Sequence, residues 1–233
     1  MPKITKIVEV ANDDDDETDT DTEIEAADTD AAYADGDVTG EDAGIDALDG
    51  LRAVARLARL CGRINWFAAV GEPLEPSEIA DAEAYVANLG FPDVSVGAVE
   101  DWRAAAAAAQ APEWRQDWWD AEEQMRQALL QEALQINPEP DLMVALTHVS
   151  TKASEVAHGL AAVSAARGGV ADEALIRVAA GAAAQAAYQA ALVLAAQAES
   201  MAGDAEHPFA VKFRLFEAGR LPLGIVGSTF NLF

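Results

Sequence analysis

The chain has 233 residues, 51% of them hydrophobic, so it is long enough to bury the core of one domain. Its formal net charge of −26 argues against direct binding to nucleic acids or to anionic membranes, because both depend on Lys and Arg side chains that neutralise phosphates. The single cysteine, Cys61, excludes an intramolecular disulfide, and its apolar neighbourhood predicts a small buried residue.

The negative charge is concentrated at the N-terminus. The first 50 residues carry 18 acidic and 2 basic residues, a net of −16, whereas residues 51–233 carry 23 acidic and 13 basic residues, a net of −10. Like charges repel one another, and this segment offers little apolar surface to offset the entropy of ordering it. We therefore predict that residues 1–43 form a mostly disordered acidic tail, with a short strand allowed at residues 3–10 by their β-branched side chains.

A helical domain is predicted for residues 44–219. Hydrophobic residues recur there at spacings of three and four, which is typical of helices, and segments rich in glycine or proline separate the periodic stretches. Ser77 is predicted to cap the second helix, and Pro112 to lie in the first turn of the fourth. We expect about six or seven helices, within residues 47–70, 76–90, 100–110, 113–136, 142–167, 172–201 and 207–218.

The segment 172–201 is built mainly from alanine, with small side chains on nearly every face. A helix without bulk lets its neighbours approach closely, so we place it at the centre of a bundle, with Leu175, Val178, Leu192 and Leu194 making the larger contacts. Alanine is too weakly apolar for this segment to indicate a membrane span. The N-terminus lacks the apolar core of a signal peptide, and we expect a cytoplasmic protein.

The last residues, 220–233, predict a β-hairpin. Two β-prone runs, 223–226 and 229–233, flank the pair Gly227-Ser228, and a two-residue turn that begins with glycine is a hairpin signal. An isolated hairpin is marginally stable, so this one is expected to dock on the helical domain. The predicted fold is therefore an all-α multi-helix bundle with a small C-terminal β-hairpin and a disordered acidic N-terminal tail.

Glu155 and His158 are the candidate metal ligands. They lie three residues apart on a predicted helix, as in the Glu-x-x-His pairs of four-helix metalloproteins, and His148 lies two turns earlier on the same stripe. A second Glu-x-x-His is absent, and the apolar residues of this helix lie on the opposite face. An exposed polar face with no cofactor is therefore the first interpretation, and a site for iron, manganese or zinc the alternative.

Two neighbouring carboxylates, Glu122 and Glu123, lie in the middle of the predicted helix 113–136. Either could supply a metal ligand or take part in acid–base catalysis. A spacing of four residues from Glu122 to Arg126 instead predicts an ion pair on the helix surface.

The tryptophans are crowded, with Trp102, Trp114, Trp118 and Trp119 falling within 18 positions. Trp114 and Trp118 would share one face of a helix, from which Trp119 turns away by about 100°. Large aromatic residues can fill a core opposite an alanine-rich helix. They are also enriched at binding hot spots, so Trp114, Trp118 and Trp119 are the candidate partner-binding residues.

No motif in the sequence specifies a reaction. We expect a non-enzymatic helical protein-binding module, such as an adaptor, an inhibitor or an immunity-type protein, that engages another protein through its acidic or Trp-rich surface; its charge favours a basic partner. One alternative is a helical-bundle metalloenzyme with a site around Glu155 and His158. Another is a structural or self-assembling component whose tail maintains solubility. The sequence does not determine the oligomeric state.

Overall fold

The computed structural model describes residues 48, 50–197 and 205–233. In these residues it contains seven helices and a three-stranded sheet, which confirms the predicted helical bundle with its C-terminal hairpin. The predicted acidic tail, residues 1–43, lies outside the described residues, as does the strand allowed at residues 3–10.

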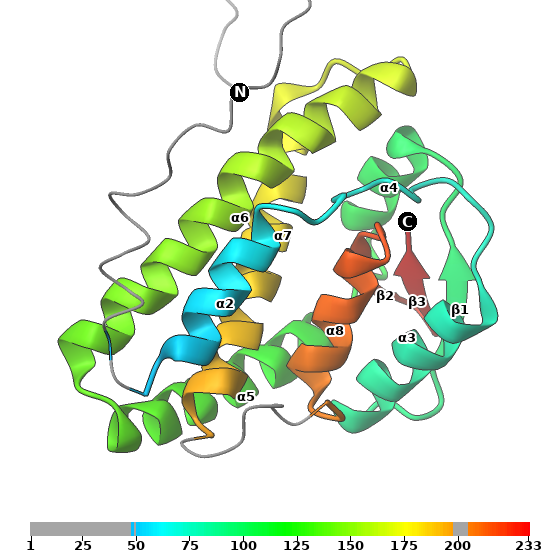
Figure 1. The fold of residues 1–233 in the computed structure, drawn as a ribbon. Helices are drawn as coiled ribbons and strands as arrows, with labels where there is room; N and C mark the ends of the chain where they lie inside the picture. The colour runs from blue at the N-terminus through cyan, green and yellow to red at the C-terminus, as the bar shows by residue number, and fades with distance from the viewer. Residues whose placement is uncertain (1–47, 49, 198–204) are drawn as a thin grey trace, which may run out of the picture. The chain divides into compact units, whose positions relative to one another are not determined.

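The bundle is built around two long helices, α6 (Glu139–Arg167) and α7 (Glu173–Ala195), which lie side by side (Figure 1). The helix α2 packs against both, and α8 packs on α7 and separates it from α3 and the sheet. The remaining elements are α2 (Arg52–Cys61), α3 (Pro76–Asn88), α4 (Trp102–Ala109), α5 (Gln116–Ile136), α8 (Pro208–Glu217), β1 (Ser95–Ala98), β2 (Pro222–Val226) and β3 (Thr229–Leu232).

Alanine lines the contact between α6 and α7. Because alanine adds so little bulk, the two backbones can approach closely along their length. On α6 the fully buried alanines Ala153, Ala157, Ala161 and Ala165 recur every four residues, and on α7 Ala183, Ala187 and Ala191 do the same, with Ala186 beside them.

The central position predicted for α7 is confirmed, because this helix contacts α2, α5, α6 and α8. Within the described residues it is also the one helix that is long and apolar enough to cross a membrane, and most of it is buried by its neighbours. One detail of the prediction is wrong: Val178 is 65% exposed instead of packing in the core.

The start of α3 differs from the prediction. The N-cap is Glu75 instead of Ser77, and the Glu78 carboxylate accepts a hydrogen bond of 2.8 Å from the Glu75 backbone N–H. This reciprocal capping box satisfies amide groups that have no partner within the first turn of a helix.

The start of α5 also differs, since the helix begins at Gln116 and not near Pro112. The Arg115 backbone N–H donates to the Ile225 carbonyl at 2.8 Å, and the Gly227 N–H donates to the Glu113 carbonyl at 2.9 Å. Residues 113–115 therefore follow the edge of β2, where Trp114 forms a bridge to Val226, and α5 begins only after this pairing ends.

The sheet has the strand order β1-β3-β2. As predicted, Gly227-Ser228 connects β2 and β3 as an antiparallel hairpin. The third strand, β1, was not predicted; it runs parallel to β3, with Val96 opposite Phe230. A four-residue strand that begins at a surface serine has too little hydrophobic alternation to stand out in a sequence.

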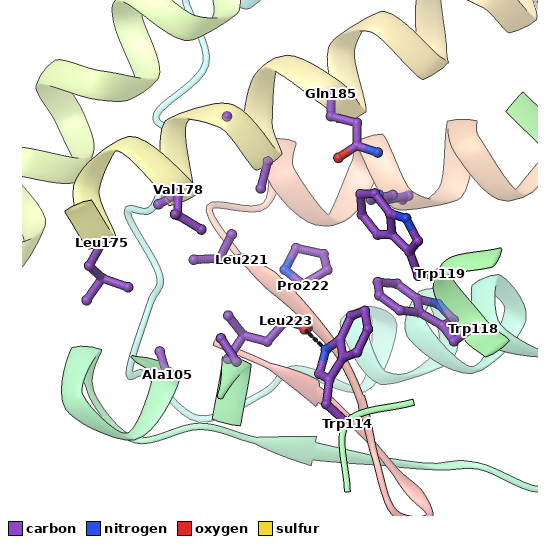
Figure 2. A pocket seen from close by; sticks show the side chains of 15 residues that line it. Ala105, Trp114, Trp118, Trp119, Leu175, Val178, Gln185, Leu221, Pro222 and Leu223 are labelled. Atoms are coloured by element: carbon purple, nitrogen blue, oxygen red, sulfur yellow. Dashed lines mark hydrogen bonds between the residues drawn. The ribbon is translucent and has the colours of Figure 1, made fainter. Parts of the chain in front are cut away.

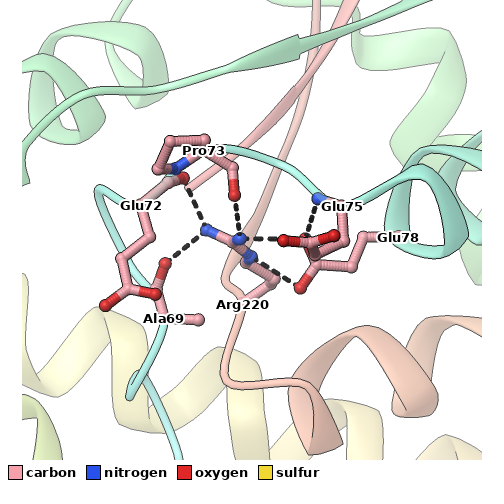
Figure 3. Close-up of polar contacts among 6 residues, drawn as sticks. All are labelled: Ala69, Glu72, Pro73, Glu75, Glu78 and Arg220. Atoms are coloured by element: carbon pink, nitrogen blue, oxygen red, sulfur yellow. Dashed lines mark hydrogen bonds and ion pairs between the residues drawn. The ribbon is translucent and has the colours of Figure 1, made fainter.

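Arg220 anchors the hairpin to the helices (Figure 3). Its guanidinium donates from Nε and Nη2 to the two carboxylate oxygens of Glu78, at 2.9 and 2.8 Å. It also donates to the carbonyls of Ala69, Glu72 and Pro73, the last two at 2.8 and 2.7 Å. Arg220 is only 2% exposed, and these five hydrogen bonds satisfy its buried charge. They join the C-terminal segment to the start of α3.

Candidate functional site

An apolar pocket of about 310 Å³ lies between α4, α5, α7, α8 and β2. In Figure 2 the three tryptophans stand on one side of it, and Leu175 and Val178 of α7 stand on the other. Aliphatic and aromatic side chains predominate in its lining, which consists of Ala105, Ala109, Trp114, Trp118, Trp119, Leu175, Val178, Ala179, Gly181, Ala182, Gln185, Lys212, Leu221, Pro222 and Leu223.

The tryptophan wall is a chain of edge-to-face ring contacts. The centroids of Trp114 and Trp118 are 5.9 Å apart, and those of Trp118 and Trp119 are 6.5 Å apart. The Trp114 Nε1 donates to the Leu223 carbonyl at 3.3 Å, which ties the wall to β2. The structure thus brings all three candidate partner-binding residues to one pocket, and their role in binding stays a prediction.

Gly224 of β2 makes room for this wall. Its backbone φ of +106° lies in a region that residues with a side chain rarely adopt. An added Cβ would also lie 2.8 Å from both Trp114 Nε1 and Trp118 Cζ3. Gly227, in the adjacent turn, also has a positive φ of +61°, but an added Cβ there would meet nothing within 4 Å. Substitutions at the two glycines therefore distinguish the effect of backbone strain alone from the effect of strain combined with a clash against the tryptophans.

We expect Gly224→Ala to lower the free energy of unfolding by about 2–5 kcal/mol, since it adds a steric clash to the backbone strain. Gly227→Ala, which introduces strain alone, is expected to cost about 1–2 kcal/mol. Urea unfolding followed by tryptophan fluorescence measures both. Equal losses for the two variants would show that the tryptophan wall does not need a glycine at position 224.

The rim of the pocket exposes large apolar side chains. Val178 is 65% exposed and Trp119 is 37% exposed, and both lie beside the apolar interior of the pocket. Exposed apolar groups next to a concave apolar surface mark binding sites more often than isolated exposed residues do. Val178 therefore belongs to the candidate site and not to the core.

Lys212 forms part of the pocket wall and points its ammonium group into a buried cluster. Its Nζ donates to Glu122 Oε1 and, at 3.2 Å, to Gln189 Oε1, while Gln189 Nε2 donates to Glu122 Oε1 at 2.9 Å. All three residues are at most 5% exposed. The pocket therefore borders an ion pair that is removed from solvent.

This arrangement shows that the predicted ion pair between Glu122 and Arg126 is wrong. Arg126 binds Glu123 instead, from Nε to Oε2 at 2.7 Å. The Arg126 hydrogen bond lowers the pKa of Glu123 to about 2, with Gln127 contributing. Although the two residues are adjacent on α5, the Glu123 carboxylate is thus half-buried, whereas the Glu122 carboxylate faces α7 and α8.

The sequence around Lys212 indicates that this lysine is buried, although the spacing of hydrophobic residues alone does not show it. It is the single lysine in the apolar stretch PFAVKFRLF, where both neighbours, Val211 and Phe213, are buried. A lysine in such a stretch needs a buried partner, because an unpaired charge in the interior is very unfavourable. Its actual partners are 90 and 23 residues away, so the sequence could not name them.

The candidate metal ligands lie elsewhere, on α6. Glu155 is exposed and His148 is half-buried. His158 Nε2 lies 3.6 Å from Glu173 Oε1, and these side chains are 44% and 64% exposed. Within residues 48, 50–197 and 205–233, no group of three or more His, Cys, Asp or Glu side chains could hold a metal ion. A metal role for His148, Glu155 and His158 therefore stays a prediction without added support.

Cys61 is fully buried, and burial, together with the nearby charge of Glu217, raises the pKa of its thiol to about 12. The thiol is therefore protonated at neutral pH and cannot act as a nucleophile.

Comparisons with protein families, curated proteins and solved structures found no match to this chain. Its function must therefore be inferred from the geometry and chemistry of the site.

Proposed function

We propose that this protein is a non-enzymatic protein-binding module, of the adaptor, inhibitor or immunity type, whose tryptophan-lined pocket receives apolar side chains of a partner protein. The observation that carries the proposal is an apolar pocket walled by Trp114, Trp118 and Trp119 with an exposed apolar rim. Tryptophan is among the residues that most often dominate the binding energy of an interface, because its large ring buries much apolar surface against a partner.

The size of the pocket suits side chains from a partner. A cavity of about 150 Å³ holds one benzene-sized ring. At about 310 Å³, this pocket matches two such groups, as an amphipathic helix presents them on adjacent turns. Besides the tryptophans, Gln185 and Lys212 are the lining residues with polar side chains, and the Lys212 ammonium group is already bound to Glu122.

The charge of the chain favours a basic partner. Its net charge of −26 attracts cations over long distances, which raises association rates more than it raises affinity. Near the pocket, exposed Asp117 and Asp120 flank the Trp118–Trp119 pair, whereas exposed Arg177 adjoins Val178. The long-range attraction therefore comes from the chain as a whole, and the pocket supplies the apolar contacts.

Photo-cross-linking at the rim tests the proposal. A benzophenone amino acid is placed at position 178, and a matched one at position 144 of α6, where valine is 58% exposed but does not line the pocket. We expect one basic protein to be cross-linked from position 178 and not from position 144. Equal cross-linking from both positions would contradict the proposal.

The purified partner is then titrated against variants of the full chain. We expect Val178→Asp to weaken binding at least about 10-fold, and Trp119→Ala about 30-fold, because both remove apolar contacts between the pocket rim and the partner. Val144→Asp should change the affinity less than about 2-fold. Unchanged affinity for both pocket variants would exclude the pocket as the binding site.

Two alternatives are tested on the same material. Elemental analysis of protein purified without chelators tests the metalloenzyme around Glu155 and His158, since stoichiometric iron, manganese or zinc is required for it.

Light scattering tests self-assembly, because a strict monomer excludes a structural component built from copies of this chain.

A further inference from the structure

The strand β1 forms one edge of the sheet, because the strand order is β1-β3-β2 (Figure 1). The N–H groups of Ser95 and Val99 donate to carbonyls of the hairpin, at 3.0 and 2.9 Å. Alternate residues of a strand direct their backbone groups to opposite sides, so the N–H groups of Val96 and Ala98 point away from β3. In the described part of the chain these two groups have no hydrogen-bond partner. An extended segment can therefore add to this edge as a fourth strand.

A second pocket, of about 350 Å³, begins where β1 ends. Glu100 and Asp101, which closely follow the strand, line this pocket together with Glu72, and all three are exposed. One oxygen of Asp101 caps α4, by accepting from two backbone N–H groups at 2.9 and 2.8 Å. The lining also contains one basic residue, Arg167. Three carboxylates against one guanidinium leave a net charge of −2, which favours a cation.

Aromatic rings form the apolar part of this second pocket. The Trp102 ring contacts those of Phe67 and Phe233 edge to face, with centroids 6.1 and 5.1 Å away. All three residues line the pocket and are at most 3% exposed, so the rings lie at its base and the carboxylates at its rim.

This combination of rings and carboxylates selects an organic cation. The carboxylates are not arranged as metal ligands, since the described residues contain no group of three side chains that could hold a metal ion. Lysine and arginine side chains combine a long apolar stem with a charged end, and their cations interact favourably with aromatic rings. A side chain of this kind matches both the base and the rim of the pocket.

We propose that β1 and the second pocket form a docking site for an extended segment of a partner protein, which pairs with β1 and places a Lys or Arg side chain in the pocket. In strand addition, main-chain hydrogen bonds give affinity and side-chain pockets give specificity. A second copy of this chain fits less well, because antiparallel pairing centred on β1 would place Asp93 of each copy opposite Glu100 of the other. The proposal does not depend on the tryptophan-lined pocket, so either site can fail without the other.

Amide hydrogen exchange of the full ¹⁵N-labelled chain, followed by NMR, tests the edge. Without a ligand, the Val96 and Ala98 amides should exchange rapidly, whereas the Gly97 amide, which faces β3, should be protected. The probes are acetyl-Arg-Thr-Val-Thr-Val-amide and the reversed acetyl-Val-Thr-Val-Thr-Arg-amide, because a strand can add in either direction. At about 10 times its dissociation constant, one of them should slow exchange at Val96 and Ala98 about 10-fold. Protection of these amides without peptide, or no effect of either peptide, would overturn the proposal.

Two altered peptides separate strand pairing from charge. A version N-methylated at each valine and threonine keeps its charge but loses the N–H groups that would pair with β1. A version with citrulline in place of arginine keeps the shape of the side chain but loses its charge. Each should bind at least about 10-fold more weakly, because each lacks one of the two sets of hydrogen bonds. Undiminished binding of either altered peptide would overturn the proposal.

Substitutions in the chain test the second pocket. Glu72→Gln/Glu100→Gln removes two carboxylates and leaves the Asp101 cap of α4 in place. Its matched control, Glu132→Gln/Glu139→Gln, removes the same charge from exposed positions outside the pocket. The pocket variant should weaken binding of the arginine peptide at least about 10-fold, and the control less than about 2-fold, because long-range attraction is shared by the whole chain.

Equal effects of the two double variants would show that overall charge alone attracts the peptide, and would overturn the proposal. The altered peptides are titrated against the unaltered chain, so they decide the outcome if the pocket variant does not fold.

Discussion

Replacing Arg220 with methionine is expected to lower the free energy of unfolding by about 3–5 kcal/mol, because removing one partner of a buried ion pair leaves the other charge uncompensated. The variant would leave the Glu78 carboxylate without its counter-charge, and the carbonyls of Ala69, Glu72 and Pro73 without their donor. Urea or guanidinium unfolding at pH 7, followed by circular dichroism, measures the loss.

Arg214→Met is the matched control. Arg214, which lies on α8, also binds α3, through an ion pair with Asp81 at 2.7 Å, but these side chains are 37% and 30% exposed. An exposed pair of this kind contributes about 1 kcal/mol or less. Comparable losses for Arg220→Met and Arg214→Met would contradict the anchoring role that burial gives to Arg220.

The pH dependence of stability provides a second readout for the same pair. Burial alone would raise the pKa of Glu78, but the hydrogen bonds from Arg220 and the Glu75 amide, with the charge of Arg220, outweigh it, and the net pKa is lowered from 4.5. The folded state therefore favours the ionised form. This stabilisation is present above about pH 4.5 and is lost as the pH falls toward the lower folded-state pKa. In Arg220→Met this loss on the acid side should disappear.

Lys212→Met is the second substitution with a large expected effect, again about 3–5 kcal/mol at pH 7. Without the ammonium group, Glu122 is a buried carboxylate, 1% exposed, whose remaining hydrogen bond comes from Gln189. A charge left in the interior without a partner is very unfavourable. Denaturant unfolding at pH 7, followed by circular dichroism, measures the loss.

A compensating substitution makes this prediction specific. In Lys212→Met/Glu122→Gln neither charge remains, and the new amide keeps a partner in Gln189, so most of the lost stability should return. Glu123→Gln, one position along the same helix, removes a partly exposed pair with Arg126 and should cost about 1 kcal/mol or less. A double variant no more stable than Lys212→Met would show that the loss comes from packing of the lysine stem.

Local chemistry explains why several elements could be predicted. The helices α3, α6 and α7 and the hairpin β2–β3 are encoded in hydrophobic spacing and turn residues that lie close together in the sequence. The α3 cap was misplaced by two residues through a local capping box, whereas two other errors arose where a distant segment intervened. Hydrogen bonds between residues 113–115 and the hairpin delay the start of α5, and β1 exists only because β3 lies beside it.

The candidate site divides in the same way. Crowding in the sequence was enough to single out Trp114, Trp118 and Trp119, but it could not separate core packing from a pocket wall. That distinction depends on β2 and α7, which lie more than 50 residues further along the chain. Gly224 shows no special feature until the two indoles are seen to pack against its backbone.

By itself, the sequence determined the charge of the protein, its helical class, the alanine-rich central helix and the residues with unusual chemistry, because these follow from composition and from spacing within one element. Only the tertiary structure decided that Glu122 is buried while Glu123 is half-exposed, that Val178 lines a pocket rim, and that Lys212 meets its counter-charge 90 residues away. Burial and charge pairing are properties of contacts between elements, and such contacts have no fixed separation along the chain.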